Sequence, residues 1–188
     1  MMRMSLVLIV LCLLCLTYVA SATELKVDVE PPSQEILIGD SGSYNITVSC
    51  SVELDTGNHN LTITCYDENN SLTDKLYCEV SFVSAPSGVN ASQVNLAETL
   101  RDASSVTYSW CAPSAGDYVF ELVVSFNRSS EEQVQVGEQF IIVVSDNKAD
   151  TIIQASATVY ATAIPELLTS MLVGAGVLTI GYLTTRKL

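Results

Sequence analysis

Hydrophobic and polar residues alternate with a period of two along the middle of the chain, which is the pattern of half-buried β-strands. The segments that alternate in this way are residues 25–29, 35–38, 44–52, 61–65, 76–82, 106–110, 118–126 and 139–144. Residues 84–104 interrupt the pattern, and we expect them to be irregular or partly helical. Many short strands separated by turn residues, without an amphipathic helix of any length, predict an all-β antiparallel sandwich.

The N-terminal segment differs from this pattern because it is apolar on every side. Arg3 is followed by a short apolar stretch and then by Ala20-Ser21-Ala22. One positive charge, an apolar segment and a small-residue A-x-A site are the three parts of a secretory signal peptide. We therefore expect residues 1–22 to be a signal peptide that is cleaved after Ala22.

The C-terminal segment is a second apolar stretch. Residues 167–185 carry no charge over 19 positions, and as a helix they would be roughly 28 Å long, close to the hydrocarbon thickness of a bilayer. Arg186 and Lys187 follow directly, which places this end in the cytoplasm. We expect residues 164–185 to be a transmembrane helix or a sorting tail and residues 186–188 to be the cytoplasmic end. The predicted location is the extracellular face of the cell membrane, as a single-pass protein with its N-terminus outside.

The segment between the two apolar ends is strongly acidic. All 21 acidic residues lie in it, against five basic residues, which gives a net charge of −16. A phosphate backbone needs Lys and Arg to displace its counterions, so this charge excludes nucleic acid as a partner. The length suits one domain. We predict an extracellular β-sandwich domain over residues 23–148 and a stalk over residues 149–163.

Four cysteines remain once the signal peptide is removed, and an even number in an exported chain indicates disulfide bonds. Cys65 and Cys78 are equidistant from the centre of the loop at residues 67–74, and both fall on the inward side of their predicted strands. We therefore expect them to meet across a hairpin, which leaves Cys50 to pair with Cys111. On the chain-entropy account, the second bridge would stabilise the fold by roughly 4 kcal/mol.

Five N-x-S/T sequons indicate a glycoprotein, because chance supplies only one or two in a chain of this composition. Their asparagines are Asn45, Asn60, Asn69, Asn90 and Asn127. A glycan can be carried only where the side chain faces water. Asn45, Asn60 and Asn127 all fall on the polar side of the predicted alternation, and the other two lie in expected loops.

The sequence offers no recognisable catalytic site, metal site or cofactor motif. Its one histidine, His59, lies in a stretch that is typical of an exposed turn. The adjacent carboxylates Glu131 and Glu132 would point apart in a strand. Two loops hold oxygen ligands that suit calcium, without the regular spacing of a calcium loop: Asp55, Asn58 and Asn60, or Asp67, Glu68 and Asp74. We expect no enzyme activity.

The segment from Tyr108 to Phe120 contains Trp110, Pro113, Gly116 and Tyr118. It resembles the strand, turn and strand signature of immunoglobulin-like sandwich modules in prokaryotic surface proteins. The resemblance implies an immunoglobulin-like antiparallel sandwich, here with one C-terminal transmembrane helix. The Cys, Trp, Cys order of antibody domains is absent, since Trp110 directly precedes Cys111.

The tail Ile164-Pro165-Glu166, followed by the apolar segment and Arg186-Lys187, is similar to the tripartite sorting signals that archaeal and some bacterial sortases process. The resemblance implies cleavage near the motif and transfer to a surface anchor. Leu167 stands where the archaeal form usually has Phe. A plain membrane anchor and a glycolipid anchor are the alternatives.

These features predict a membrane-anchored cell-surface glycoprotein with a structural or adhesive role, whose partners are the membrane and surface proteins or glycans. The alternative is a non-catalytic, ligand-binding subunit of an envelope or membrane complex. A face free of glycans would favour the alternative.

Overall fold

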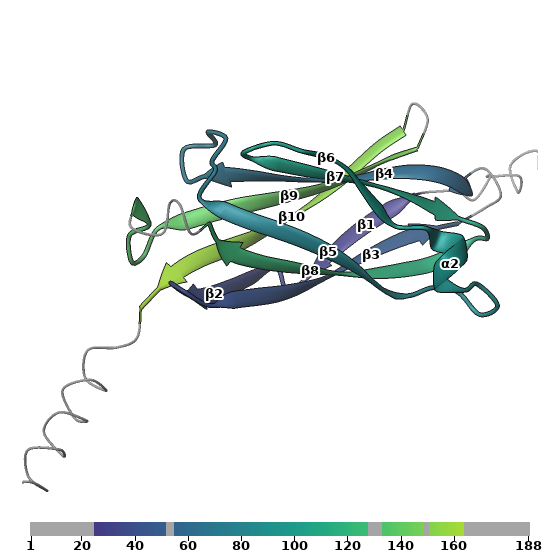
Figure 1. The fold of residues 1–188 in the computed structure, drawn as a ribbon, viewed down its shortest axis with the longest axis horizontal. Helices are drawn as coiled ribbons and strands as arrows, with labels where there is room; N and C mark the ends of the chain where they lie inside the picture. The colour runs from purple at the N-terminus through teal and green to yellow at the C-terminus, as the bar shows by residue number, and fades with distance from the viewer. Residues whose placement is uncertain (1–24, 52–54, 128–132, 149–150, 164–188) are drawn as a thin grey trace, which may run out of the picture.

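The computed structural model describes residues 25–51, 55–127, 133–148 and 151–163. Two β-sheets pack face to face, as Figure 1 shows. The four-stranded sheet has the order β1 (Lys26–Glu30), β3 (Ser41–Cys50), β8 (Gly116–Phe126) and β5 (Leu76–Ser84). The six-stranded sheet has the order β2 (Ser33–Leu37), β10 (Thr151–Thr162), β9 (Gln139–Lys148), β4 (Gly57–Asp67), β7 (Ser105–Ala112) and β6 (Ala97–Arg101). One short helix, α2 (Ala91–Val94), precedes β6. The prediction of an all-β sandwich is confirmed.

The strand order is that of an immunoglobulin constant-type sandwich with added strands. In such a sandwich, strands A, B, E and D form one sheet and strands C, F and G form the other. Here β1, β3, β8 and β5 take the first set of places, and β4, β9 and β10 take the second. The strands β6 and β7 are inserted between the D and E positions and extend the second sheet beyond β4. The strand β2 extends its opposite edge.

The core lies between the sheets and is built from the alternating rows that the sequence contains. Along β8, Tyr118, Phe120 and Leu122 are completely buried, and the residues between them are half-buried. Trp110 of β7 packs from the opposite sheet onto Tyr118 and Phe120, with ring centroids 5.0 and 5.1 Å away. Burial of such large aromatic side chains contributes much of the hydrophobic stabilisation of a domain this size.

The corner between β7 and β8 joins the two sheets. The hydroxyl of Tyr118 donates to the carbonyl of Ser114 at 2.8 Å and accepts from its N–H at 3.2 Å, as in a tyrosine corner. Gly116 has φ of +133°, and a Cβ atom at this position would lie 2.5 Å from the ring of Pro86. Only glycine fits both the backbone conformation and the space.

Three predictions about the strands are wrong. Residues 151–162 were expected to belong to a stalk, but they form β10, which lies inside the six-stranded sheet between β2 and β9. Residues 97–101, within the expected irregular stretch, form β6. The sandwich is not wholly antiparallel, because β10 pairs with β2 in parallel register. The small alanines 155, 157 and 161 weaken the hydrophobic signal of β10, which explains why its alternation is hard to recognise.

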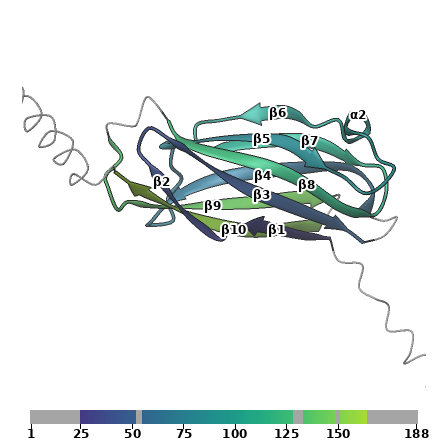
Figure 2. The same cartoon turned by 90° about the horizontal axis from the view of Figure 1, so that it is seen from below.

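The predicted hairpin between residues 61–65 and 76–82 does not form. The strands β4 and β5 belong to different sheets, so residues 67–74 carry the chain from one sheet to the other. Figure 2 shows the sandwich turned by 90°, with β1 beside β10 and the two layers seen from below. The alternation along each strand is correct, but it could not say which strands are neighbours.

The predicted signal peptide (1–22), the tail (164–185) with its motif Ile164-Pro165-Glu166, and the cytoplasmic end (186–188) lie outside the described residues. Within the described residues, no helix is long and apolar enough to cross a membrane.

Candidate functional site

The most concentrated polar chemistry in the described residues is a buried cluster around His59. This residue is 2% exposed and lies within β4, so the prediction of an exposed turn histidine is wrong. Its Nδ1 lies 2.7 Å from Oδ1 of Asp146, and its Nε2 lies 2.7 Å from the backbone carbonyl oxygen of Asp55. The indole N–H of Trp110 donates to the other carboxylate oxygen of Asp146 at 2.8 Å. The rings of His59 and Trp110 stack with centroids 4.3 Å apart.

The hydrogen bonds of this cluster leave neither ring nitrogen of His59 available as a general base. The carbonyl of Asp55 can only accept, so Nε2 of His59 carries the hydrogen that it donates. A second hydrogen must lie between Nδ1 and the Asp146 carboxylate. Both ring nitrogens are therefore engaged, and the side chains of His59 and Asp146 are fully buried. The arrangement stabilises the core and leaves no free nitrogen for a general base.

Cys50 lies at the same end of the sandwich. Burial, followed by the nearby charges of Asp146 and Asp55, raises the pKa of its thiol to about 12. A thiol with so high a pKa stays protonated and is a poor nucleophile. Cys50 faces the core, whereas Cys111 lies on the outward, half-exposed side of β7. The side chains of the predicted pair therefore point in different directions, Cys50 into the core and Cys111 toward the outside of the other sheet. Their disulfide stays a prediction.

Cys65 of β4 and Cys78 of β5 lie at the opposite end of the sandwich, and both are buried. Their sulfur atoms are 3.5 Å apart as thiols. The hydrogen bond with Cys65, together with burial, raises the pKa of the Cys78 thiol well above its ordinary value. Their disulfide stays a prediction, and it would join the two sheets instead of the two arms of a hairpin.

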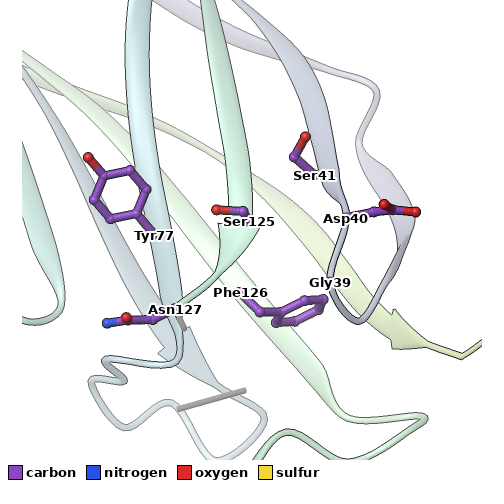
Figure 3. A pocket seen from close by; sticks show the side chains of 7 residues that line it. All are labelled: Gly39, Asp40, Ser41, Tyr77, Ser125, Phe126 and Asn127. Atoms are coloured by element: carbon purple, nitrogen blue, oxygen red, sulfur yellow. The ribbon is translucent and has the colours of Figure 1, made fainter. Parts of the chain in front are cut away.

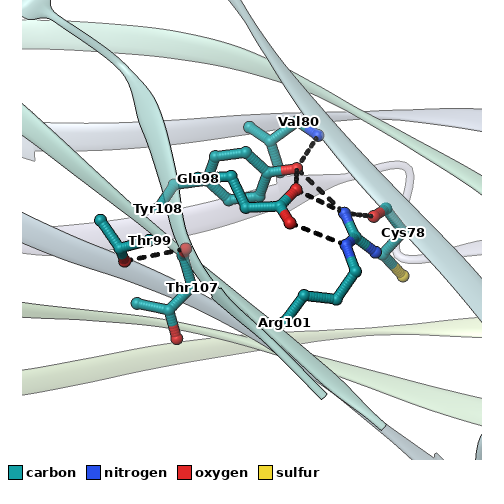
Figure 4. A network of polar contacts seen from close by, with 7 residues as sticks. All are labelled: Cys78, Val80, Glu98, Thr99, Arg101, Thr107 and Tyr108. Carbon is teal, nitrogen blue, oxygen red and sulfur yellow. Dashed lines mark hydrogen bonds and ion pairs between the residues drawn. The ribbon is translucent and has the colours of Figure 1, made fainter. Parts of the chain in front are cut away.

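Arg101 spans the gap between the sheets and reaches Cys78, as Figure 4 shows. Its guanidinium donates to the Glu98 carboxylate at 2.7 and 2.9 Å and to the carbonyl oxygen of Cys78 at 3.1 Å. It also lies over the ring of Tyr77, 4.6 Å from its centroid. The hydrogen bond from Arg101 lowers the pKa of Glu98 and raises the pKa of Arg101 above its usual value.

Two hollows open at this end. A hollow of about 310 Å³ is lined by residues that include both cysteines and Arg101. A wider one of about 560 Å³ lies between the end of β8 and the start of β3, where Figure 3 shows the side chains of Tyr77, Ser125 and Asn127 at its rim. Among the described residues of its lining, Asp40 is the single carboxylate. This set of hydroxyls, one carboxylate and one amide can donate and accept hydrogen bonds, but it has no base positioned beside a nucleophile.

The sequon asparagines are distributed over both sheets and the connecting loops. Asn45 on β3 and Asn60 on β4 are exposed between buried neighbours, as their parity predicts. Asn69 and Asn90 are exposed outside the strands. Asn127 is half-buried, and its side-chain amide donates to the carbonyl of Asp74 at 3.2 Å. Glycosylation itself stays a prediction.

The two loops considered for calcium do not gather their ligands. Asn58 and Asn60 point outward from β4, on the opposite face from His59. The carboxylate of Asp67 accepts the backbone N–H groups of Asn69 and Ser71, each at 2.9 Å. In the part of the chain that the structure describes, no three His, Cys, Asp or Glu side chains lie close enough to share a metal ion.

The outward faces of the two sheets differ in charge. The face of the four-stranded sheet, here called the acidic face, carries Lys26 and five carboxylates: Asp28, Glu30, Glu79, Asp117 and Glu121. The neutral face is the outward side of β10, β9, β4 and β7. It comprises the even-numbered residues 152–160 and 58–66 and the odd-numbered residues 139–147 and 105–111. None of these described positions is charged.

The sequence contains the signal for the buried cluster, although the predicted inward rows ended before they reached His59 and Asp146. The inward row Leu61, Ile63 and Cys65 extends back to His59 with the same parity, and the row Ile142 and Val144 extends forward to Asp146 in the same way. What the rows could not show is that β4 and β9 are neighbours, with His59 and Asp146 on the same face.

Comparisons with known proteins define similarity of fold only. No protein-family model and no curated protein matches this chain. Among solved structures, the major pilin subunit of Bacillus cereus is 15% identical, with a TM-score of 0.48 over 74% of this chain and 40% of the pilin. A type I cohesin–dockerin complex from Clostridium thermocellum is 11% identical, with a TM-score of 0.47 over 77% of this chain and 99% of the other. A protein that catalyses macrocyclization in alchivemycin A biosynthesis is 11% identical, with a TM-score of 0.38 over 76% and 91%.

Proposed function

We propose that the chain is a membrane-anchored cell-surface glycoprotein with a structural or adhesive role, carrying one β-sandwich outside the cell. The observation that carries the proposal is the placement of the sequons. Asn45 and Asn60 lie within regular strands and are exposed, although the residues on either side of them are buried. A sequon in a strand can be used only with this parity, and only in a chain that is exported.

Two further features support the proposal. The signal-peptide pattern of residues 1–22 and the apolar residues 167–185 have the composition expected of an exported and anchored chain. Because β10 ends at Thr162, only Ala163 separates the sandwich from the motif Ile164-Pro165-Glu166. The domain would then lie close to the membrane surface, without the stalk expected from the sequence.

A non-catalytic subunit of an envelope or membrane complex is the second candidate. The neutral face favours it, since Asn60 is the one sequon asparagine on that face and lies toward one end of its strand. Such a subunit would use the neutral face to bind a different protein. Identification of a stoichiometric partner of the purified chain would distinguish it from a self-contained surface protein.

The proposed function is tested on intact cells that express the full chain. A membrane-impermeant lysine reagent should label the chain, and Asn45→Gln and Asn60→Gln should each reduce the intact mass by one glycan while the chain remains folded. Intact mass should also give an N-terminus at Thr23. It should give a C-terminus at Leu188 for a plain anchor, or near residues 164–166 with an adduct for a sorting signal. A chain that is inaccessible to the reagent and unchanged in mass by both substitutions would contradict the proposal.

A further inference from the structure

The neutral face stands out against the rest of the molecule. The chain has a formal net charge of −13, yet the outward positions of four adjacent strands carry only uncharged side chains. The first charge beyond them among the described residues of β2 is Glu35, which pairs with Tyr160 at the edge of the sheet. A surface that only had to stay soluble would be expected to carry charges of both signs.

The side chains of this face are those that pack well between sheets. Ile141 of β9 lies between Thr158 of β10 and Tyr66 of β4 in the strand register. Val143, two residues further along β9, lies between Ser156 and Thr64. Ile141 and Val143 form the centre, and hydroxyl groups such as those of Thr158, Ser156 and Thr64 surround them. Face-to-face packing of two sheets interdigitates such rows at a separation of about 10 Å.

The charge distribution favours a second copy of this chain as the partner of the neutral face. Two copies that approached through their acidic faces would place carboxylates such as Glu79 and Glu121 against one another, which is unfavourable within the Debye length of about 8 Å. Two copies that approach through their neutral faces avoid this repulsion. A two-fold symmetric contact also requires a patch that complements itself, and an uncharged face of hydroxyl, amide and branched side chains meets that requirement.

The size of the face sets the strength of the contact. Four strands spaced about 4.8 Å apart, with seven to nine residues each in the face, cover roughly 19 Å by 28 Å, or about 500 Å² per copy. This is below the 800 Å² per partner of a standard stable interface. The glycan proposed at Asn60 lies toward one end of β4 and would reduce the contact further. The contact should therefore be weak in dilute solution, and tethering to one membrane would raise the effective concentration enough to populate it.

We propose that the neutral face is a homotypic docking surface through which two copies of this chain associate side by side. This inference rests on the proposed function, because surface tethering supplies the concentration that a weak contact needs. The strand β10 lies within the face and leads directly toward the proposed anchor. Two copies held in the same membrane could therefore bring their faces together without reorientation of either domain.

The test uses two matched pairs of substitutions in the full chain. Val143→Glu introduces a charge at the centre of the neutral face, where Ser156 and Thr64 are the cross-strand neighbours. Val119→Glu does the same on the acidic face, where the neighbours are Ser84 and Thr47. Both valines are half-buried on inner strands. Ser156→Glu and Ser43→Glu form the second pair, at exposed serines that a carboxylate should not destabilise.

Self-association is measured by sedimentation equilibrium of the purified full chain in density-matched detergent. The unmodified chain, Val119→Glu and Ser43→Glu should dimerise within about twofold of one another. Val143→Glu and Ser156→Glu should weaken the dimer by about tenfold or more, because two like charges would be buried at each contact. Far-ultraviolet circular dichroism checks that each variant is folded, and the serine pair decides the test if the valine variants unfold.

Other outcomes overturn the proposal. A chain that stays monomeric to about 500 µM contradicts it, as does equal weakening by the two members of both pairs. Stoichiometric binding of a different protein or a glycan by the monomer, abolished by Ser156→Glu, would assign the face to another occupant. A monomer that cell labelling places on the surface would refute this inference alone. A chain that is not surface-exposed would refute the proposed function whether or not it dimerises.

Discussion

The strand β4 runs between two ends of the sandwich that differ in how their buried polar atoms are paired. At one end, His59 is enclosed by Asp146, Trp110 and the carbonyl of Asp55, and each polar atom of the cluster has a partner inside the core. Six residues along the same strand, Cys65 faces Cys78 beside a hollow of about 310 Å³, which Arg101 bridges from the sheet edge.

The difference follows from the positions of the strands. His59 lies between β7 and β9 on the inner strands of its sheet, where Asp146 of β9 supplies a hydrogen-bond partner and Trp110 of β7 supplies a stacking ring. At the other end, the edge strands β5 and β6 belong to different sheets, and no backbone hydrogen bonds join them. A side chain or a covalent bridge must hold the sheets together there. One end therefore depends on a closed electrostatic cluster, and the other on long side chains and cysteines.

The largest effect is expected from Asp146→Ala at the closed end. The substitution leaves the His59 ring and the Trp110 N–H buried without their carboxylate, which should lower the free energy of unfolding by about 3–5 kcal/mol. Urea denaturation measures the loss. Asp117→Ala, which removes an exposed carboxylate on the acidic face, is the control and should change stability by less than about 0.5 kcal/mol. A loss below about 1 kcal/mol for Asp146→Ala would mean that the cluster contributes little to the closed end.

The next effect concerns the cysteines of the open end. The sequence predicts a disulfide between Cys65 and Cys78, and closing a loop of this size should stabilise the fold by about 3 kcal/mol, which Cys78→Ala would remove. The same comparison under reducing conditions, where neither protein has a disulfide, is the control. Peptide mapping under non-reducing conditions identifies the pairs, including the predicted Cys50 and Cys111 bridge. A bond between Cys50 and Cys65 would contradict the strand assignment at both ends.

A smaller effect is expected from Arg101→Gln, which removes the charged donor to Glu98 and the stacking on Tyr77. The loss should be about 1–2 kcal/mol, with Arg101→Lys intermediate. The hydrogen bond with Arg101 is the main reason that the pKa of Glu98 is lowered. The ionised Glu98 therefore contributes to folding stability above its ordinary pKa of 4.5, and this contribution is lost as the pH falls through the lowered pKa. The acid limb of the stability profile should therefore be shallower in Arg101→Gln. Identical acid limbs in the two proteins would show that the pair does not stabilise the open end.

The smallest effect is expected between the two ends, at Tyr44. Burial raises its pKa from 10.0 to about 12, and its hydroxyl donates to the carbonyl of Thr158 in the other sheet at 3.2 Å. A raised pKa means that the folded state favours the protonated phenol. Its contribution is thus complete below pH 10 and is lost as the pH rises through about 12. In Tyr44→Phe, stability should fall less steeply between pH 10 and 12. The unmodified chain, measured over the same pH range, is the reference.

The sequence by itself determined which way most strands face. Alternation places Asn45 and Asn60 outward and the row from Tyr118 to Phe126 inward, because successive side chains of a strand point to opposite faces whatever the strand pairs with. The alternation likewise predicted an all-β sandwich, and the composition showed an excess of negative charge. These properties are local, since they depend on residues two apart or on the chain as a whole.

Only the tertiary structure decided which strands are neighbours and where their ends meet. Partner choice rests on contacts between residues far apart in sequence, such as His59 with Asp146 and Cys65 with Cys78 across two sheets. A polar residue at the end of an inward row looks like a turn residue when its partner on the neighbouring strand is not known. For this reason His59 was predicted to lie in a turn. The segment that forms β10 was predicted to be a stalk for a related reason. Its inward side chains are small, and only the pairing with β9 and β2 shows that it is a strand.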